Sequence, residues 1–136
     1  MTRLTLSLQS DLLAVCRLNP DVPVPAWADG PGFVSITRTA DELSVVCAQM
    51  RVPATVKAET GWRAFKVAGP LDFSLIGILA ALVQPLAAAK ISVFTVSTFD
   101  TDYLLVKATD VHATIRTWQN AGYHITGAVD DSSTLS

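Results

Sequence analysis

The 136-residue sequence is poor in charge, cysteine and aromatic residues. Only 16% of its residues are charged and its net charge is −2, so no basic face is available to bind nucleic acid. Two cysteines, Cys16 and Cys47, are too few for a disulfide-rich scaffold and do not have zinc-ligand spacing. Because both lie in apolar, strand-like runs, we expect buried, reduced thiols.

The sequence also lacks a long apolar run. Its uncharged stretch from Phe73 to Ala89 is shorter than the roughly 20 residues of a membrane-spanning helix, and Gln84 and Pro85 interrupt it. At the N-terminus, Leu4, Leu6 and Leu8 alternate with polar residues, which predicts a strand rather than a targeting segment. We therefore expect no membrane span and a cytoplasmic location.

Recognisable catalytic and metal-binding patterns are missing as well. His112 and His124 lie on different predicted elements, without a cysteine or carboxylate cluster at metal-ligand spacing. No serine stands in a nucleophile-elbow setting, and no glycine-rich loop is suited to a phosphate. The sequence therefore predicts no enzyme, no cofactor and no metal site.

What the sequence does contain is apolar residues for a core, since 50% of the chain is hydrophobic. The second half predicts two helices and four strands in the order βαββαβ, an α+β, ferredoxin-like arrangement with an antiparallel sheet and both helices on one face. The expected strands are Trp62–Val67, Ile91–Thr98, Tyr103–Lys107 and Tyr123–Thr126. We expect the first helix to be capped by Asp72 and to loosen near Pro85, and the second to begin at Asp110.

The first half is less regular, but it predicts a hairpin from Phe33–Thr37 and Leu43–Ala48. The segment SITRTADELSVV, from Ser35, aligns without gaps with TVSTFDTDYLLV, from Thr95, and this alignment places Glu42 on Asp102. We interpret the first half as a degenerate copy that has lost helix. The predicted domains are residues 1–60 as this degenerate half, 61–127 as the complete domain, and 128–136 as a flexible tail.

The run GPLDFSLIGILAALVQPLAAAKISVFTVSTFDTDYLLV, at residues 69–106, resembles the ACT domains of the bacterial CASTOR-like group, which is related to the eukaryotic cytosolic arginine sensors. The segments TRTADELSVVC, at residues 37–47, and GWRAFKV, at residues 61–67, are similar to that group too. The resemblance implies a tandem pair of ACT units. It also implies a regulatory rather than catalytic role, and an amino acid or similar ligand bound between units, often within dimers.

The resemblance also indicates which residues form a ligand site. Gly77 and Ile78 match the helix-start segment, where a glycine allows close approach and free amides favour a carboxylate. The hairpin residues would supply a carboxylate for an ammonium or guanidinium group, hydroxyl contacts and an apolar wall. These hairpin residues are Ser97, Thr98, Phe99, Asp100, Thr101 and Asp102. Ordinary roles in packing and turn formation remain open for all eight. Leu75 and Ile76 stand near where the arginine sensors carry an acid, which argues against arginine as the ligand and indicates either a less basic ligand or an empty pocket.

Two functions from different classes follow. The first is a sensor that binds an amino acid or related metabolite, forms a homodimer and reports to an unidentified regulatory protein. The second is an interaction module in which the same surface forms a dimer or docks on a partner without a metabolite. A small hydrolase is a third, weaker interpretation, because no loop with the arginine and asparagine of an acylphosphatase is recognisable.

Overall fold

The computed structural model describes residues 4–68 and 76–127. Contacts divide the chain into two compact units. Unit 1 contains residues 1–10 and 63–136, and unit 2 contains residues 11–62. This division differs from the predicted domains mainly at the N-terminus, because the first ten residues belong to the unit formed by the second half. The predicted tail at 128–136 and the predicted helix cap Asp72 lie outside the described residues.

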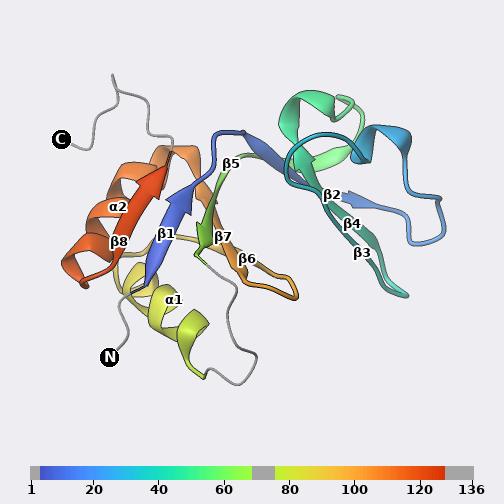
Figure 1. Ribbon diagram of the computed structural model, residues 1–136. Coiled ribbons are helices and arrows are strands. Elements are labelled where there is room, and N and C mark those ends of the chain that lie inside the picture. Colours follow the sequence, from blue (N-terminus) through green and yellow to red (C-terminus); the bar gives the residue numbers. More distant parts are fainter. Residues whose placement is uncertain (1–3, 69–75, 128–136) are drawn as a thin grey trace. The chain divides into compact units, whose positions relative to one another are not determined.

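Unit 1 is an α+β unit with two helices interspersed among its strands along the chain (Figure 1). Its elements are β1 (Thr5–Leu8), the second half of β5 (Lys57–Val67), α1 (Ile78–Ala88), β6 (Phe94–Ser97), β7 (Asp102–Lys107), the 3₁₀ turn η3 (Ala108–Asp110), α2 (Val111–Asn120) and β8 (His124–Gly127). From β5 onward the order is βαββαβ, which confirms the predicted ferredoxin-like fold.

The sheet of unit 1 has the strand order β6-β7-β5-β1-β8. Strand β1 runs antiparallel to β5, with Leu6 opposite Val67, and parallel to β8, with Leu6 opposite Ile125. The N-terminal strand therefore lies between β5 and β8. Gly127 ends β8 against it: a Cβ at this position would lie 2.5 Å from the carbonyl oxygen of Leu8, so only glycine fits this close approach.

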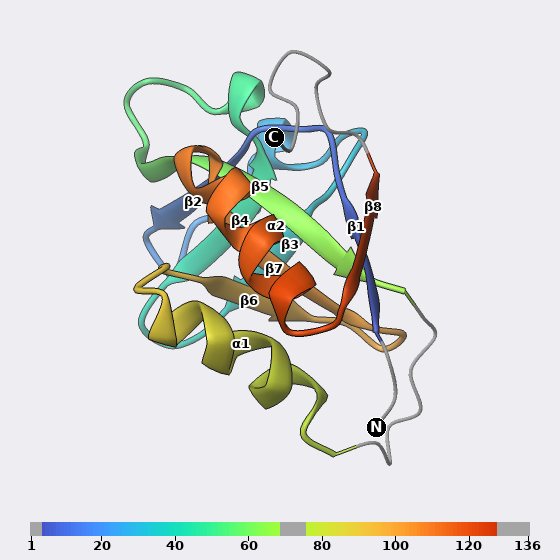
Figure 2. The ribbon, with the colours of Figure 1, turned by 90° about the vertical axis from the view of Figure 1, so that its left-hand side faces the viewer.

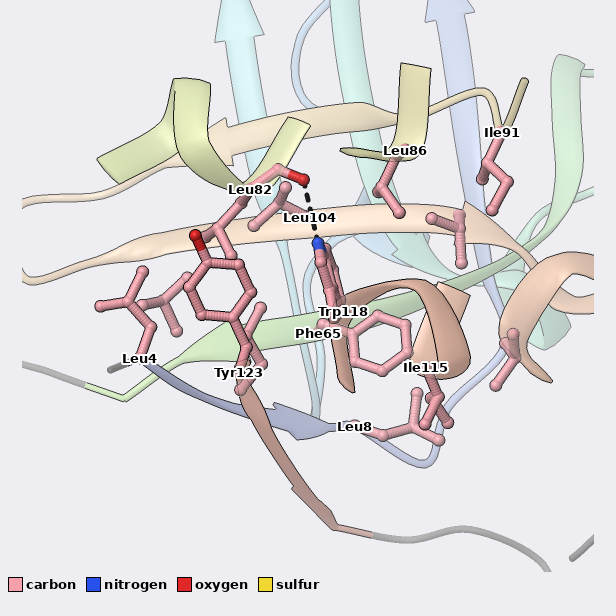
Figure 3. Close-up of a cluster of buried hydrophobic side chains, with 14 residues drawn as sticks. Leu4, Leu8, Phe65, Leu82, Leu86, Ile91, Leu104, Ile115, Trp118 and Tyr123 are labelled. Carbon is pink, nitrogen blue, oxygen red and sulfur yellow. Dashed lines mark hydrogen bonds between the residues drawn. The ribbon is translucent and has the colours of Figure 1, made fainter. Parts of the chain in front are cut away.

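Both helices of unit 1 pack on one face of this sheet, as Figure 2 shows. Leu82 and Leu86 of α1 and Ile115 and Trp118 of α2 have no exposed surface and belong to one apolar cluster with the strands. The indole of Trp118 donates a 2.9 Å hydrogen bond to the carbonyl of Leu82, so it joins the two helices (Figure 3). The ring of Phe65, on β5, meets Trp118 edge to face at 5.0 Å.

Several predicted boundaries in unit 1 were wrong by a few residues. Helix α1 begins at Ile78, with Gly77 as its N-cap, rather than one turn or more earlier. Strand β6 begins at Phe94 instead of Ile91. Residue Ile91 follows the helix end, where its amide donates to the carbonyl of Leu86 and its buried side chain joins the core. At Ile91, the β-branched residue in an apolar run thus correctly indicated a buried side chain but not a strand.

Unit 2 is a four-stranded antiparallel sheet in the order β3-β4-β2-β5. Its strands are β2 (Leu13–Leu18), β3 (Ser35–Arg38), β4 (Leu43–Ala48) and the first half of β5, and it adds the short 3₁₀ turns η1 (Ala26–Ala28) and η2 (Gln49–Arg51). A ferredoxin-like sheet orders its strands in the same way, but loops stand where its two helices would be. Unit 2 therefore has the topology expected of a degenerate copy.

The loops of unit 2 cover the sheet with apolar side chains. Val22, Trp27, Val52 and Val56 pack, partly buried, against a core that includes both free cysteines. The guanidinium of Arg51 holds the longer loop by donating to the carbonyls of Trp27 at 3.1 Å and Pro31 at 2.9 Å.

The two hairpins share one register. Arg38 pairs with Leu43 in unit 2 as Ser97 pairs with Asp102 in unit 1, an offset of 59 residues. The predicted alignment used an offset of 60 and was wrong by one residue. Its error has a physical cause: four consecutive residues are buried in β4 and three in β7, so burial on both faces removes the alternation that would fix the register.

Candidate functional site

The turn between β6 and β7 is formed by the four residues 98–101. The amide of Thr98 donates to the carbonyl of Thr101 at 2.8 Å. The hydroxyl of Thr98 donates to the same carbonyl at 3.0 Å and accepts the amide of Thr101 at 3.3 Å. Directly below the turn, the hydroxyl of Ser97 donates to Oδ1 of Asp102 at 2.6 Å. These bonds give the turn a defined geometry without any ligand.

Thr101 fastens this turn to the neighbouring strand. Its side chain is 4% exposed, and its hydroxyl donates a 2.7 Å hydrogen bond to the carbonyl of Val67, the last residue of β5. A buried hydroxyl needs such a partner, because an unsatisfied one costs about 1–3 kcal/mol. The predicted ligand role of Thr101 therefore competes with a structural one.

The tip of the turn exposes Phe99 and Asp100. Phe99 has 80% of its surface exposed, unusually much for a phenylalanine. Asp100 is exposed as well, and its carboxylate makes no hydrogen bond or ion pair with the described residues. Two consecutive residues, one aromatic and one acidic, are thus both exposed to solvent.

Gly77 and Ile78 form the start of α1. Gly77 has φ +82°, a left-handed conformation that favours glycine, and its carbonyl accepts the first helical hydrogen bond, from Ala81 at 2.9 Å. Glycine has no side chain to cap the first amides, and the first turn carries no acidic residue. Ile78 is partly buried against the core of unit 1. Within residues 76–127, the helix start therefore offers amide donors and no side-chain acceptor for them.

The structure thus brings four predicted site residues, Ser97, Thr98, Thr101 and Asp102, into one hydrogen-bonded turn with Phe99 and Asp100 at its tip. Gly77 and Ile78 come from another element, and the segment that leads to them, residues 69–75, lies outside the described residues. Sequence reasoning noted Ile76 only as a departure from the arginine sensors and did not include it among the site residues, although it is 94% exposed directly before Gly77. A large aliphatic residue next to a glycine that begins a helix was the available signal.

The two cysteine thiols, both in unit 2, are unreactive. Burial raises the pKa of the Cys16 thiol to about 11, and the nearby Cys47 adds to this shift. Burial also raises the pKa of Cys47, against a smaller lowering by Arg51. Both thiols are therefore protonated and weakly nucleophilic at neutral pH.

No group of three or more potential metal ligands occurs among residues 4–68 and 76–127. In the same part of the chain, no helix has the length and apolar character needed to cross a membrane.

Comparisons with known proteins agree with the two-part division. A family model described as an ACT domain matches residues 57–120, and a separate model for an N-terminal domain matches residues 11–55. A crystal structure of a protein from Agobacterium tumefaciens is 42% identical, with a TM-score of 0.90 over 96% of this chain and 97% of that one.

Two further matches are less similar. The cytosolic arginine sensor for mTORC1 subunit 1 from Bos taurus is 31% identical over 83% of this chain. The chain spans only 38% of the length of that sensor. Aspartate kinase from Synechocystis is 16% identical and shares the fold, with a TM-score of 0.64 over 93% of this chain and 28% of its own.

Proposed function

Because the chain belongs to the ACT-domain proteins of the CASTOR-like group, we propose that it is a non-catalytic regulatory protein that binds an amino acid. The ligand carboxylate binds the amides at the start of α1, and its ammonium group binds near Asp100 or Asp102. The observation that carries this proposal is the start of α1 at Gly77, where no side chain of the described residues caps the first amides, since free amides at a helix start favour a negative charge.

The turn between β6 and β7 supports the second half of this assignment. Asp102 is half-buried and one of its carboxylate oxygens accepts a hydrogen bond from Ser97, whereas Asp100 is exposed. Asp100 is therefore the better partner for an ammonium group, and Asp102 mainly holds the turn. Ser97, Thr98 and Thr101 act chiefly by fixing the turn, because their hydroxyl groups donate within the protein.

The remaining parts of the proposal concern the protein's setting. We propose a cytoplasmic homodimer in which two copies of the ACT unit enclose the ligand. A change in their packing would then report the ligand to a regulatory partner. The name of the bovine relative, a cytosolic sensor, supports the location and the sensing role.

Calorimetric titration with the common amino acids tests the binding proposal. Binding by at least one of them is expected, and the variant Gly77→Trp should abolish it because a large side chain fills the approach to the amides. Gly61→Trp is the matched control: Gly61 has φ +78° and, like Gly77, open space where a Cβ would lie, so both variants carry similar backbone strain. The proposal fails if no amino acid binds, or if both variants lose binding equally.

A second function is favoured by the exposure of Ile76 and Phe99, two large apolar side chains of unit 1. On this hypothesis the surface docks a second copy or another protein without a metabolite. Ultracentrifugation separates the two functions: an interaction module stays associated in the absence of amino acids and weakens with Phe99→Ser, and amino acids leave its association unchanged.

A further inference from the structure

We infer that the ligand is an amino acid with an uncharged, apolar side chain, and that Phe99 selects it. This inference rests on the proposed function and adds the chemical class of the ligand. It is argued from the turn at residues 98–101, where every polar side chain except that of Asp100 already makes a hydrogen bond within the protein.

The polar side chains of the turn are committed to the fold. The hydroxyl of Thr98 bonds to Thr101, and that of Thr101 bonds to Val67. Directly before the turn, the hydroxyl of Ser97 donates a hydrogen bond to one carboxylate oxygen of Asp102. A ligand with a polar or charged side chain would have to compete with these short bonds. Asp100 is the exception, since its carboxylate is exposed and has no partner among the described residues.

One exposed carboxylate satisfies one positive charge. A neutral amino acid has a single ammonium group, which Asp100 can bind through a charge-assisted hydrogen bond. Arginine carries a second cation, and its planar guanidinium is best held by a carboxylate that accepts two parallel hydrogen bonds. Asp102 is poorly suited to this, because it is half-buried and one of its oxygens already accepts from Ser97.

Phe99 provides the complementary apolar contact. Its ring is 80% exposed next to Asp100, so an aliphatic or aromatic side chain bound there would remove apolar surface from water on both partners. Ile76, 94% exposed, stands directly before Gly77, the residue proposed to receive the ligand carboxylate. Both ends of the proposed site therefore carry an apolar side chain beside the group that binds a charge.

Calorimetry with leucine, phenylalanine and arginine as separate ligands tests this inference. Leucine or phenylalanine should bind at least about tenfold more tightly than arginine, the scale on which an apolar contact discriminates between ligands. Phe99→Ala should reduce that preference by about tenfold, whereas Asp100→Asn should weaken all ligands together because each has the same ammonium group.

Matched controls are available in unit 2. Met50, 91% exposed, controls for loss of an exposed apolar side chain, and Asp41 is the aspartate at the corresponding position of the other hairpin turn. Met50→Ala and Asp41→Asn should leave affinity unchanged. Tightest binding of arginine, or a preference insensitive to Phe99→Ala, overturns the inference but leaves the proposed function standing. Absence of binding by any amino acid overturns the proposed function itself.

Discussion

The two hairpin turns share a backbone design but differ at their tips. In unit 2, the amide of Thr39 donates to the carbonyl of Glu42 at 2.9 Å, and the hydroxyl of Thr39 accepts the amide of Glu42 at 3.2 Å. Thr98 and Thr101 make the same two bonds in unit 1. The tip residue differs, since Ala40 stands where unit 1 exposes Phe99. The shared bonds form the turn, so a distinct function is to be sought in the residues that differ.

The units also differ in what covers their sheets. Two helices joined by the bond from Trp118 to Leu82 cover unit 1, whereas loops held by Arg51 cover unit 2. A helix satisfies most of its backbone groups internally, but a loop needs partners from elsewhere. An arginine with several donors serves this purpose. The comparison predicts that the stability of unit 1 depends most on the buried ring of Trp118, and that of the loops of unit 2 on the guanidinium of Arg51.

The largest effect is expected from Trp118→Ala. This change removes a fully buried indole, its hydrogen bond to Leu82 and its contact with Phe65, and should cost about 3–5 kcal/mol of unfolding free energy. Urea denaturation measures it. Trp27→Ala is the control in unit 2, where the ring is only partly buried over the core and the loss should be clearly smaller. Equal losses would contradict the distinction between a helical and a loop-built cover.

Next in size is Arg51→Met, which keeps the apolar stem but removes two hydrogen bonds to loop carbonyls. We expect a loss of about 1.5–3 kcal/mol, the range for bonds with a charged donor. Limited proteolysis should then cut the loop at residues 19–34 faster. Arg38→Met removes an exposed bond to the carbonyl of Pro20 and should have less effect. If loop cleavage is unchanged in Arg51→Met, the arginine does not hold the loop.

How far the sequence predicts this structure depends on the type of signal. The four apolar segments and two helices of the second half were recognisable because periodicity and β-branched residues agreed with each other there. The position of β1 between β5 and β8 could not be recognised, since the local sequence Leu4–Leu8 predicts a strand but not which strands pair with it. The predicted alignment of the two hairpins was wrong by one residue because their second strands are buried on both faces.

The site shows the same limit. Sequence resemblance pointed to the residues of the turn, but it could not divide them into bonded and exposed groups. That Thr101 is turned inward to Val67, whereas Phe99 and Asp100 remain exposed, depends on the pairing of β7 with β5. Such pairing is a tertiary property, so only a structure separates the residues that hold the turn from those able to contact a ligand.

A smaller effect tests whether the two turns are equivalent. Thr39→Val and Thr98→Val each remove a hydroxyl that accepts an amide across the turn, and each should cost about 1 kcal/mol. Similar losses in urea denaturation would support a common design. Thr37→Val, at an exposed strand position, is the control and should cost little. A loss confined to one of the two turns would show that their resemblance has no energetic counterpart.

The smallest effect concerns the helix ends that unit 2 lacks. Helix α1 ends with the amide of Lys90 donating to Ala87 and that of Ile91 to Leu86, and α2 ends in the same pattern at Gly122. Lys90 has φ +62°, where glycine is favoured, whereas Gly122 has φ +96°. Lys90→Gly should therefore stabilise the protein by about 0.5–1 kcal/mol, and Gly122→Ala should destabilise it by a similar amount.

Thermal unfolding of both variants measures these opposite changes. A Cβ added at Gly122 would meet nothing within 4 Å, so its replacement reports backbone strain rather than a clash. If Lys90→Gly destabilises the protein instead, the lysine side chain contributes more to the end of α1 than its strained backbone costs. The two helices would then end in the same hydrogen-bond pattern for different energetic reasons.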